Sequence, residues 1–167
     1  ILHTLEALEE QGFTVTLLRP QKDGIVTAAQ VAAALTNETC LVSVMYANNE
    51  IGSILPISAI GAVCREAGVL FHTDAVQAVG HVNIDVHKQG IDMMSVSGHK
   101  IHAQKGIGFL YVKKGIPMTN LIYGGAQERN KRPGTTNTPA IVATAAALKK
   151  CCEDMDKNIA YVSKFRD

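Results

Sequence analysis

The chain has 167 residues, a formal net charge of +1, 47% hydrophobic residues and 19% charged residues. This length is enough to bury the core of one domain, and the composition excludes a disordered or fibrous protein. The small net charge excludes a strong field for nucleic acid or an anionic membrane, and no apolar run is long enough to cross a bilayer. We therefore expect a cytoplasmic or organelle-matrix protein without nucleic-acid or membrane partners.

The first third of the chain alternates between helical and strand patterns. Residues 1–11 have the pattern of a helix, and residues 13–18 alternate apolar and polar side chains like a strand. Thr27 is suited to cap the N-terminus of a helix that continues to residue 37. Residues 40–46 form a continuous apolar run, which is typical of a strand buried on both faces.

The rest of the chain continues this alternation. We expect a helix from Pro56 to Gly68, strands at 69–72, 92–96 and 108–112, a polar glycine-rich segment at 123–139, and a helical pattern at 148–165. Helices that alternate with short strands predict an α/β fold with a mostly parallel sheet covered by helices on both faces. Ligands of such sheets bind at the carboxyl ends of the strands.

Asn49, Asp74 and Lys100 each lie at or just past the end of a predicted strand, so we expect them at one edge of the sheet. Lys100 lies among small and hydroxyl residues. An amine that is partly removed from water has a larger neutral, nucleophilic fraction and can form a Schiff base with a carbonyl. The alternative is a solvated lysine in a glycine-rich loop, which the loop sequence alone does not exclude.

Neighbouring residues could bind the other parts of a phosphorylated aldehyde. Ser97 and His99 offer a hydroxyl and an imidazole for an anion, and Asp74 could favour the protonated form of a pyridine nitrogen. Gln77 could hydrogen-bond a phenolic oxygen. Simpler roles stay open for two of them, with Asp74 as the cap of the turn at residue 75 and Gln77 as an exposed turn residue.

The four cysteines, Cys40, Cys64, Cys151 and Cys152, lack the spacing of metal ligands, so we expect reduced thiols and no metal site. Cys40 and Cys64 lie in apolar runs, where we expect core residues. Cys151 and Cys152 lie in a helical stretch, where we expect a buried or half-buried structural role.

The order of four motifs resembles the cysteine desulfurases. The motifs are Asn-Asn-Glu-Ile-Gly at 48–52, His-Thr-Asp-Ala-Val-Gln at 72–77, Ser-Gly-His-Lys at 97–100 with Lys-Gly-Ile-Gly at 105–108, and the glycine- and arginine-rich segment 124–135. Cysteine desulfurases are pyridoxal-phosphate enzymes of fold type I. They convert L-cysteine into L-alanine and an enzyme persulfide, which serves iron–sulfur cluster or thio-cofactor synthesis. The resemblance covers nearly the whole chain and implies this fold, this cofactor and a sulfur-acceptor or scaffold protein as partner.

The resemblance also implies a role for each matched residue. Lys100 would bind the cofactor aldehyde and move the substrate proton. Asp74 would pair with the pyridinium nitrogen, and Gln77 would pair with the ring oxygen. Ser97 and His99 would hold the phosphate.

Two further matched residues complete the implied site. Asn49 would bind the substrate carboxylate or the ring oxygen, and Thr135 would reach the phosphate of a partner subunit, which implies a homodimer. In relatives of this kind, a phosphate-binding turn and a ring-stacking histidine come earlier, and a persulfide cysteine and a substrate-binding arginine come later. None of these has a matching position here.

We therefore expect residues 1–167 to be the central part of a pyridoxal-phosphate-binding large domain, without its N-terminal segment and C-terminal small domain, and to be inactive in isolation. Two alternatives stay open. One is a selenocysteine lyase, because segment 129–135 also resembles the corresponding loop of those enzymes. The other is a non-catalytic scaffold with the same fold.

Overall fold

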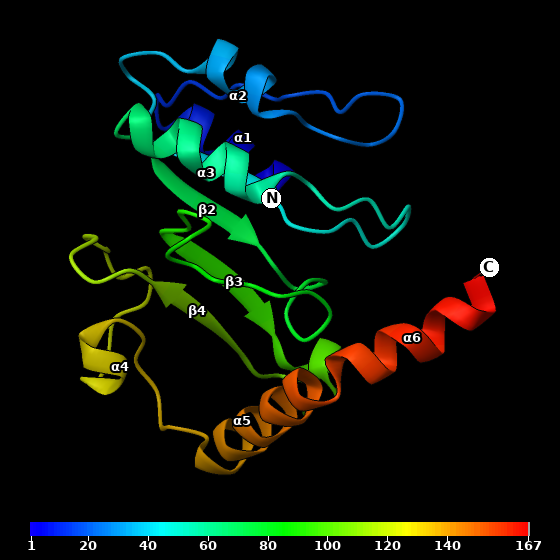
Figure 1. Ribbon diagram of the computed structural model, residues 1–167. Helices are drawn as coiled ribbons and strands as arrows, with labels where there is room; N and C mark the ends of the chain where they lie inside the picture. The colour runs from blue at the N-terminus through cyan, green and yellow to red at the C-terminus, as the bar shows by residue number, and fades with distance from the viewer. Residues whose placement is uncertain (167) are drawn as a thin grey trace.

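A four-stranded sheet in the order β1-β2-β3-β4 organises the computed structural model, which describes residues 1–166 (Figure 1). The strands are β1 (Leu41–Met45), β2 (Leu70–Asp74), β3 (Met93–Ser97) and β4 (Gly108–Val112). β1, β2 and β3 run parallel, and β4 pairs antiparallel with β3. The predicted α/β fold with a mostly parallel sheet is confirmed.

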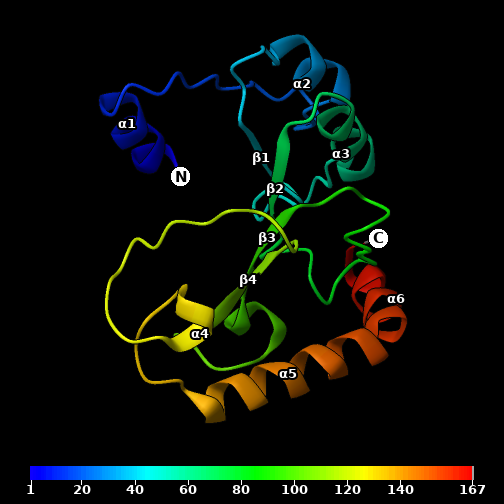
Figure 2. The same cartoon turned by 90° about the vertical axis from the view of Figure 1, so that its left-hand side faces the viewer.

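Helices lie around this sheet. They are α1 (Leu2–Glu10), α2 (Ala28–Ala34), α3 (Ile57–Glu66), the 3-10 helix η1 (Gly98–Ile101), α4 (Gln127–Asn130), α5 (Thr138–Glu153) and α6 (Met155–Arg166). Figure 2 shows α2 and α3 on one side of the strands, α1 and α4 on the other side, and α5 along one end. Across residues 1–166, no helix is both long enough and apolar enough to span a membrane.

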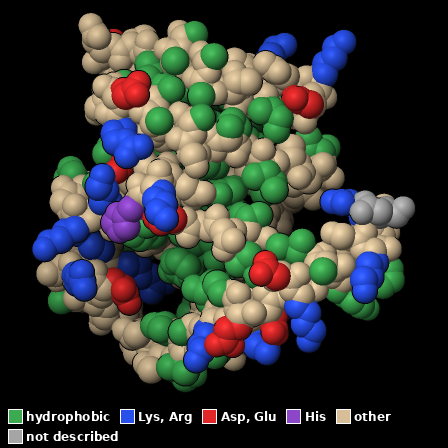
Figure 3. All heavy atoms as spheres, viewed as in Figure 1, with side chains coloured by type: hydrophobic (Ala, Val, Ile, Leu, Met, Phe, Trp, Pro, Cys, Tyr) green, Lys and Arg blue, Asp and Glu red, His purple; other side chains and the backbone are tan. Residues whose placement is uncertain are grey.

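One face of the sheet forms the core with α3. Ile57, Ile60 and Cys64 recur at three- and four-residue spacing in this helix and are buried together with Phe71 of β2. Phe71 and its neighbour on the same face, Thr73, are both 0% exposed. Figure 3 shows hydrophobic side chains gathered in the middle of the molecule, between the layer of α2 and α3 and the end formed by α5.

The opposite face of the sheet, the polar face, is half-exposed and carries His72, Asp74 and Ser95, although Leu70 and Met93 also lie on it. The burial of β2 alternates strictly, because successive side chains of a strand point to opposite faces. β1 is an edge strand within the described residues, with Leu41 46% exposed and Ser43 exposed. The prediction that residues 40–46 are buried on both faces is therefore wrong, and so is the prediction that Cys40, which is exposed, belongs to the core.

Two local predictions near the N-terminus have opposite outcomes. Residues 13–18 are not a strand, because their alternating pattern finds no partner strand within residues 1–166. Thr27 does cap α2: its hydroxyl accepts from the Gln30 N–H, and the Gln30 side chain accepts from the Thr27 N–H, forming a capping box. The helix ends at Ala34 rather than at residue 37, because Leu35 is already extended.

Candidate active site

The carboxyl ends of the three parallel strands meet at one edge of the sheet. The backbone N–H of Tyr46 donates to the Asp74 carbonyl at 2.8 Å, and the N–H of Ala75 donates to the Ser95 carbonyl at 3.0 Å. These hydrogen bonds join the residue that follows β1 to β2 and the residue that follows β2 to β3. The predicted positions of Asp74 and of the lysine turn after β3 at one edge are thus confirmed.

Asp74 closes β2 and is half-buried. One oxygen, Oδ1, accepts from the backbone N–H of Val76 at 3.0 Å, so the carboxylate caps the turn that follows. No hydrogen bond within residues 1–166 engages its other oxygen, Oδ2. The structural role proposed for Asp74 is confirmed, and it leaves one oxygen available for a ligand.

Gln77 lies in the turn after Asp74. The turn is fixed by Ala75 and Ala78, which are both 0% exposed, and the N–H of Ala78 donates to the Ala75 carbonyl at 2.9 Å. Gln77 itself is half-buried rather than exposed. The fixed turn therefore keeps Gln77 on the segment that directly follows Asp74.

Lys100 lies in η1, which begins directly after β3. The N–H of Gly98 donates to the Ile107 carbonyl at 2.9 Å, and Ile101 is 0% exposed, so both ends of this turn are anchored. Lys100 is half-buried, whereas His99 is exposed and its Nδ1 lies 2.8 Å from the Ser97 hydroxyl oxygen. The lysine is thus part of a fixed turn and not of an open solvated loop.

A layer behind η1 supports the lysine turn. The thiol of Cys151 in α5 donates to the Ile101 carbonyl at 3.5 Å, and the His81 Nε2 lies 3.4 Å from the Lys100 carbonyl oxygen. Gly80 lies so close that a Cβ there would be 2.9 Å from the Cys151 Cβ. The predicted structural role of Cys151 is confirmed, whereas the same prediction is wrong for Cys152, which is exposed because the next position along the helix faces away from η1.

The two remaining residues of the predicted site lie outside this group of contacts. Asn49 is exposed in the loop after β1, and its amide donates to Glu50 Oε1. Thr135 is exposed between α4 and α5. Neither residue forms a hydrogen bond to Asp74, Ser97 or Lys100 within residues 1–166.

A row of hydrogen-bonded side chains on the polar face was not predicted from the sequence. The Ser43 Oγ lies 2.8 Å from His72 Nδ1, and the Ser95 Oγ lies 2.9 Å from His72 Nε2. Burial lowers the pKa of His72, with the charge of Asp74 acting in the opposite direction. The signal in the sequence was the spacing of two between His72 and Asp74, which places both side chains on one face of β2.

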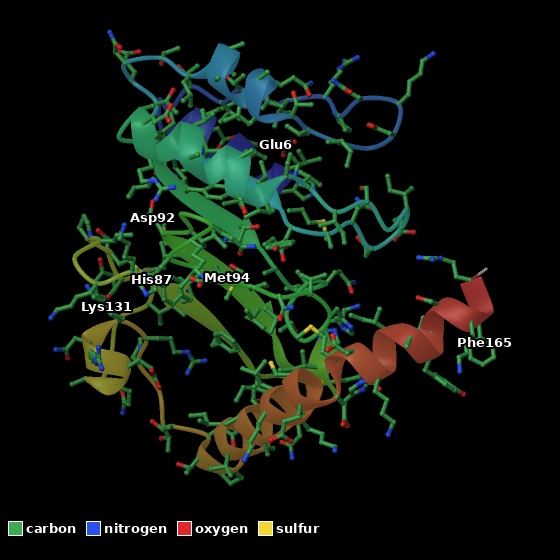
Figure 4. The ribbon with its side chains drawn as sticks, viewed as in Figure 1. Glu6, His87, Asp92, Met94, Lys131 and Phe165 are labelled. Atoms are coloured by element: carbon green, nitrogen blue, oxygen red, sulfur yellow. The ribbon has the colours of Figure 1, made fainter. Side chains whose placement is uncertain are left out.

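Within the described residues, two cavities lie at the other edge of the sheet. One of about 270 Å³ is lined by residues that include Arg65, His87, Asp92 and Lys113. In Figure 4, Asp92 and His87 lie where β3 begins, away from the carboxyl ends of the strands. Both carboxylate oxygens of Asp92 already have hydrogen-bond partners. Oδ1 accepts from the Lys113 Nζ at 3.0 Å, and Oδ2 accepts from the Phe71 N–H at 3.1 Å. Neither this cavity nor the one lined by residues such as Leu35 and Ala67 includes Asp74 or Lys100.

The aminotransferase class-V family model matches residues 1–164. This match extends from α1 into α6 and includes all four strands.

Curated relatives of the chain are named cysteine desulfurases. The cysteine desulfurase IscS of Clostridium botulinum (strain Hall) is 49% identical over 166 residues, which are 99% of this chain and 42% of that protein. The IscS of Methanosarcina thermophila is 46% identical over 167 residues, which are 100% of this chain and 41% of that protein. The resemblance predicted from the four motifs is confirmed. The chain spans less than half the length of these relatives.

Solved structures share the fold. A structure named NifS-like protein superposes with a TM-score of 0.95 at 36% identity and covers 99% of this chain and 46% of its own. A structure of SspA in complex with cysteine gives a TM-score of 0.86 at 43% identity and covers 89% of this chain and 43% of its own. The predicted fold class is confirmed by these neighbours.

Proposed function

The chain belongs to the aminotransferase class-V family, and from its similarity to proteins named cysteine desulfurases we propose that its protein is a pyridoxal-phosphate-dependent cysteine desulfurase. The proposed reaction converts L-cysteine into L-alanine and an enzyme-bound persulfide. The observation that carries the proposal is the placement of a carboxylate and an amine: Asp74 is the last residue of β2, and Lys100 lies in the turn after β3. They lie at the same edge of the sheet, where α/β proteins bind ligands.

The side chains at this edge fit the chemistry of pyridoxal phosphate. The free oxygen of Asp74 can accept the N–H of a protonated pyridine ring, and the amine of Lys100 can hold the aldehyde. Ser97 and His99 form a hydroxyl–imidazole pair for the phosphate. Gln77 offers an amide for the ring oxygen. Each functional group of the cofactor therefore has a matching group in this chain.

Each of these residues has a task in the proposed reaction. Pyridoxal phosphate, when bound, supplies an electron sink beside the α-carbon of the substrate. The Nζ of Lys100 takes the α-proton of cysteine as a general base and later returns a proton. Asp74 holds the proton of the ring nitrogen in place, and the Ser97–His99 pair anchors and orients the phosphate.

The sulfur of cysteine must pass to an accessible thiolate. Burial raises the pKa of Cys64 to about 11 and also raises the pKa of Cys151, so both stay protonated at neutral pH. Cys40 precedes β1 and therefore lies at the amino edge of the sheet, opposite to Asp74. Cys152 is exposed on α5 next to the buried Cys151. We propose that a cysteine outside residues 1–167 accepts the sulfur.

The remaining assignments follow from the same proposal. Residues 1–167 form the central part of the cofactor-binding large domain, which agrees with their coverage of 42% of a curated relative. Asn49 contacts the substrate carboxylate or the ring oxygen. Thr135, which is exposed, reaches the phosphate bound by a second subunit of a homodimer. The persulfide passes to an acceptor protein in the cytoplasm or an organelle matrix.

Reductive labelling tests the proposal. The full-length protein is loaded with pyridoxal phosphate, reduced with borohydride and digested, and its peptides are analysed by mass spectrometry. We expect the cofactor on Lys100, no label at this site in Lys100→Arg, and unchanged labelling in Lys105→Arg, which alters an exposed lysine of the same motif. A label on a different lysine, or no label at all, would remove the basis of the proposed function.

A further inference from the structure

A hydrogen-bonded row crosses the polar face of the sheet beside Asp74. It joins Ser43 of β1, His72 of β2 and Ser95 of β3 through contacts of 2.8 and 2.9 Å. His72 and Ser95 are half-buried, whereas Ser43 is exposed at the edge of the sheet. None of these three side chains takes part in the steps of the proposed reaction.

The register of the strands places Ser95 next to Asp74. Asp74 is paired with Met45 on one side and with Ser95 on the other. Adjacent strands are about 4.8 Å apart, and paired residues of neighbouring strands project from the same face. Met45 offers no hydroxyl, so Ser95 is the only flanking residue in the register that could donate a hydrogen bond to the Asp74 carboxylate. In the structure it contacts His72 instead.

One protonation pattern of the row gives every half-buried polar group a hydrogen-bond partner. The Ser95 hydroxyl has a single hydrogen, and within residues 1–166 its only partner is His72 Nε2. If this hydroxyl donates to Nε2, the neutral imidazole carries its hydrogen on Nδ1 and donates to the Ser43 oxygen. The exposed Ser43 hydroxyl can then donate to water. Every half-buried polar group of the row is satisfied in this pattern.

We propose that His72 is a positioning residue of the candidate active site, because it holds the Ser95 hydroxyl and so keeps the Asp74 carboxylate free for a pyridine N–H. This inference rests on the proposed function. Without the imidazole, the Ser95 hydroxyl would turn to the carboxylate beside it. A hydrogen bond from Ser95 would compete with the ring nitrogen and lower the basicity of the carboxylate.

A pair of substitutions tests this mechanism in the full-length protein. His72→Phe removes both hydrogen bonds of the imidazole at similar volume. We expect about tenfold to a hundredfold weaker binding of pyridoxal phosphate, measured by visible absorbance, because a competing hydrogen bond to a charged group is of that order. NMR of cofactor labelled at the ring nitrogen should report a smaller protonated fraction.

The second substitution separates positioning from structural damage. His72→Phe combined with Ser95→Ala removes the hydroxyl that would compete, so we expect binding to return to within about twofold of the wild type. Ser95→Ala alone should also bind nearly as the wild type does, and this variant covers the case in which His72→Phe does not fold. Ser43→Ala is the matched control, because it keeps the bond between Ser95 and His72.

Each outcome decides the inference. A double variant that binds as weakly as His72→Phe, a Ser95→Ala variant with weakened binding, or a His72→Phe variant that matches the wild type overturns it. A wild-type protein that binds no pyridoxal phosphate overturns the proposed function instead. The two failures are therefore distinguishable by the wild-type titration alone.

Discussion

Phe71 and His72 are neighbours in β2, but they lie on opposite faces of the sheet and in different environments. Phe71 is 0% exposed and packs in the cluster that includes α3, whereas His72 is half-buried and hydrogen-bonded to two serines. The face of Phe71 removes apolar area from water and so supplies stability. The face of His72 brings polar groups together beside Asp74, so it removes less apolar area from water. We therefore expect substitutions on the two faces to affect different measurements.

Lys100→Ala should produce the largest effect, and it should be an effect on activity. Removing the general base should lower alanine production from cysteine by about 10²- to 10⁴-fold in the full-length protein. The free energy of unfolding of the cofactor-free protein should change by no more than about 0.5 kcal/mol, because within residues 1–166 Lys100 is hydrogen-bonded only through its backbone. Activity assays and urea denaturation measure the two quantities.

Lys105→Ala is the matched control for this prediction, since Lys105 is exposed near the same turn and should retain activity. A Lys100→Ala variant with more than a tenth of the wild-type rate would contradict the assigned role.

Phe71→Ala and His72→Ala test the contrast between the two faces directly. Phe71→Ala should lower the free energy of unfolding by about 3–5 kcal/mol, because it leaves a cavity in a fully buried site. His72→Ala should lower it by about 1 kcal/mol, because its hydrogen bonds are partly replaced by water. Urea denaturation of both variants gives the comparison. Equal losses of unfolding free energy would mean that the polar face contributes as much to stability as the apolar face does.

The fold class and the edge of the sheet that carries the candidate site could be predicted from the sequence. The alternation of helices with short strands was enough to place Asp74 and Lys100 at one edge, because parallel strands share a carboxyl edge. Local chemistry was also sufficient for the Thr27 cap, which depends on residues only three apart. These features depend on patterns inside one segment or on the general geometry of parallel sheets.

The features that could not be predicted depend on the pairing of distant segments. The row of Ser43, His72 and Ser95 requires the register of three strands, which no local pattern specifies. The contact of Cys151 with the lysine turn joins residues 50 positions apart. The prediction of a strand at residues 13–18 was wrong for the same reason, because a strand needs a partner strand as well as an alternating sequence.

Gly80→Ala should disturb the layer that supports the lysine turn. An added Cβ would lie 2.9 Å from the Cys151 Cβ and 3.3 Å from the Ile101 Cγ2. We expect a loss of about 1–3 kcal/mol in the free energy of unfolding, together with weaker cofactor binding, because Ile101 is part of η1. Urea denaturation and cofactor titration measure these losses.

Gly68→Ala controls for backbone strain in this experiment. Gly68 has a φ of 69°, close to the 79° of Gly80, but an added Cβ there meets no atom within 4 Å. Gly68→Ala should therefore report the strain of a left-handed alanine alone. If the two variants lose equal stability and both bind cofactor normally, Gly80 has no steric role behind the turn.

Thr73→Val should stabilise the apolar face. Thr73 is 0% exposed, and its hydroxyl has no hydrogen-bond partner within residues 1–166. Valine has nearly the same shape without the unsatisfied hydroxyl, so we expect a gain of about 1 kcal/mol in the free energy of unfolding. Thr144→Val is the control, because the Thr144 hydroxyl donates to the Ala140 carbonyl at 2.8 Å and its loss should not stabilise. A destabilised Thr73→Val variant would indicate that this hydroxyl has a partner in the folded protein.

The smallest expected effect is a pH dependence of stability that arises from His72. Burial is the larger influence on this imidazole and lowers its pKa below the ordinary value of 6.5, while Asp74 acts in the opposite direction. The unfolded chain therefore binds a proton more readily than the folded protein does at mildly acidic pH. The contribution of His72 to stability is complete above about pH 6.5 and is lost as the pH falls below that value.

The difference in unfolding free energy between the wild type and His72→Phe should accordingly shrink between pH 7 and pH 5, measured by urea denaturation at each pH. A difference that stays constant or grows on acidification would mean that the folded protein stabilises the charged imidazole, and the polar face would then be an environment for a cation rather than for a neutral hydrogen-bonding ring.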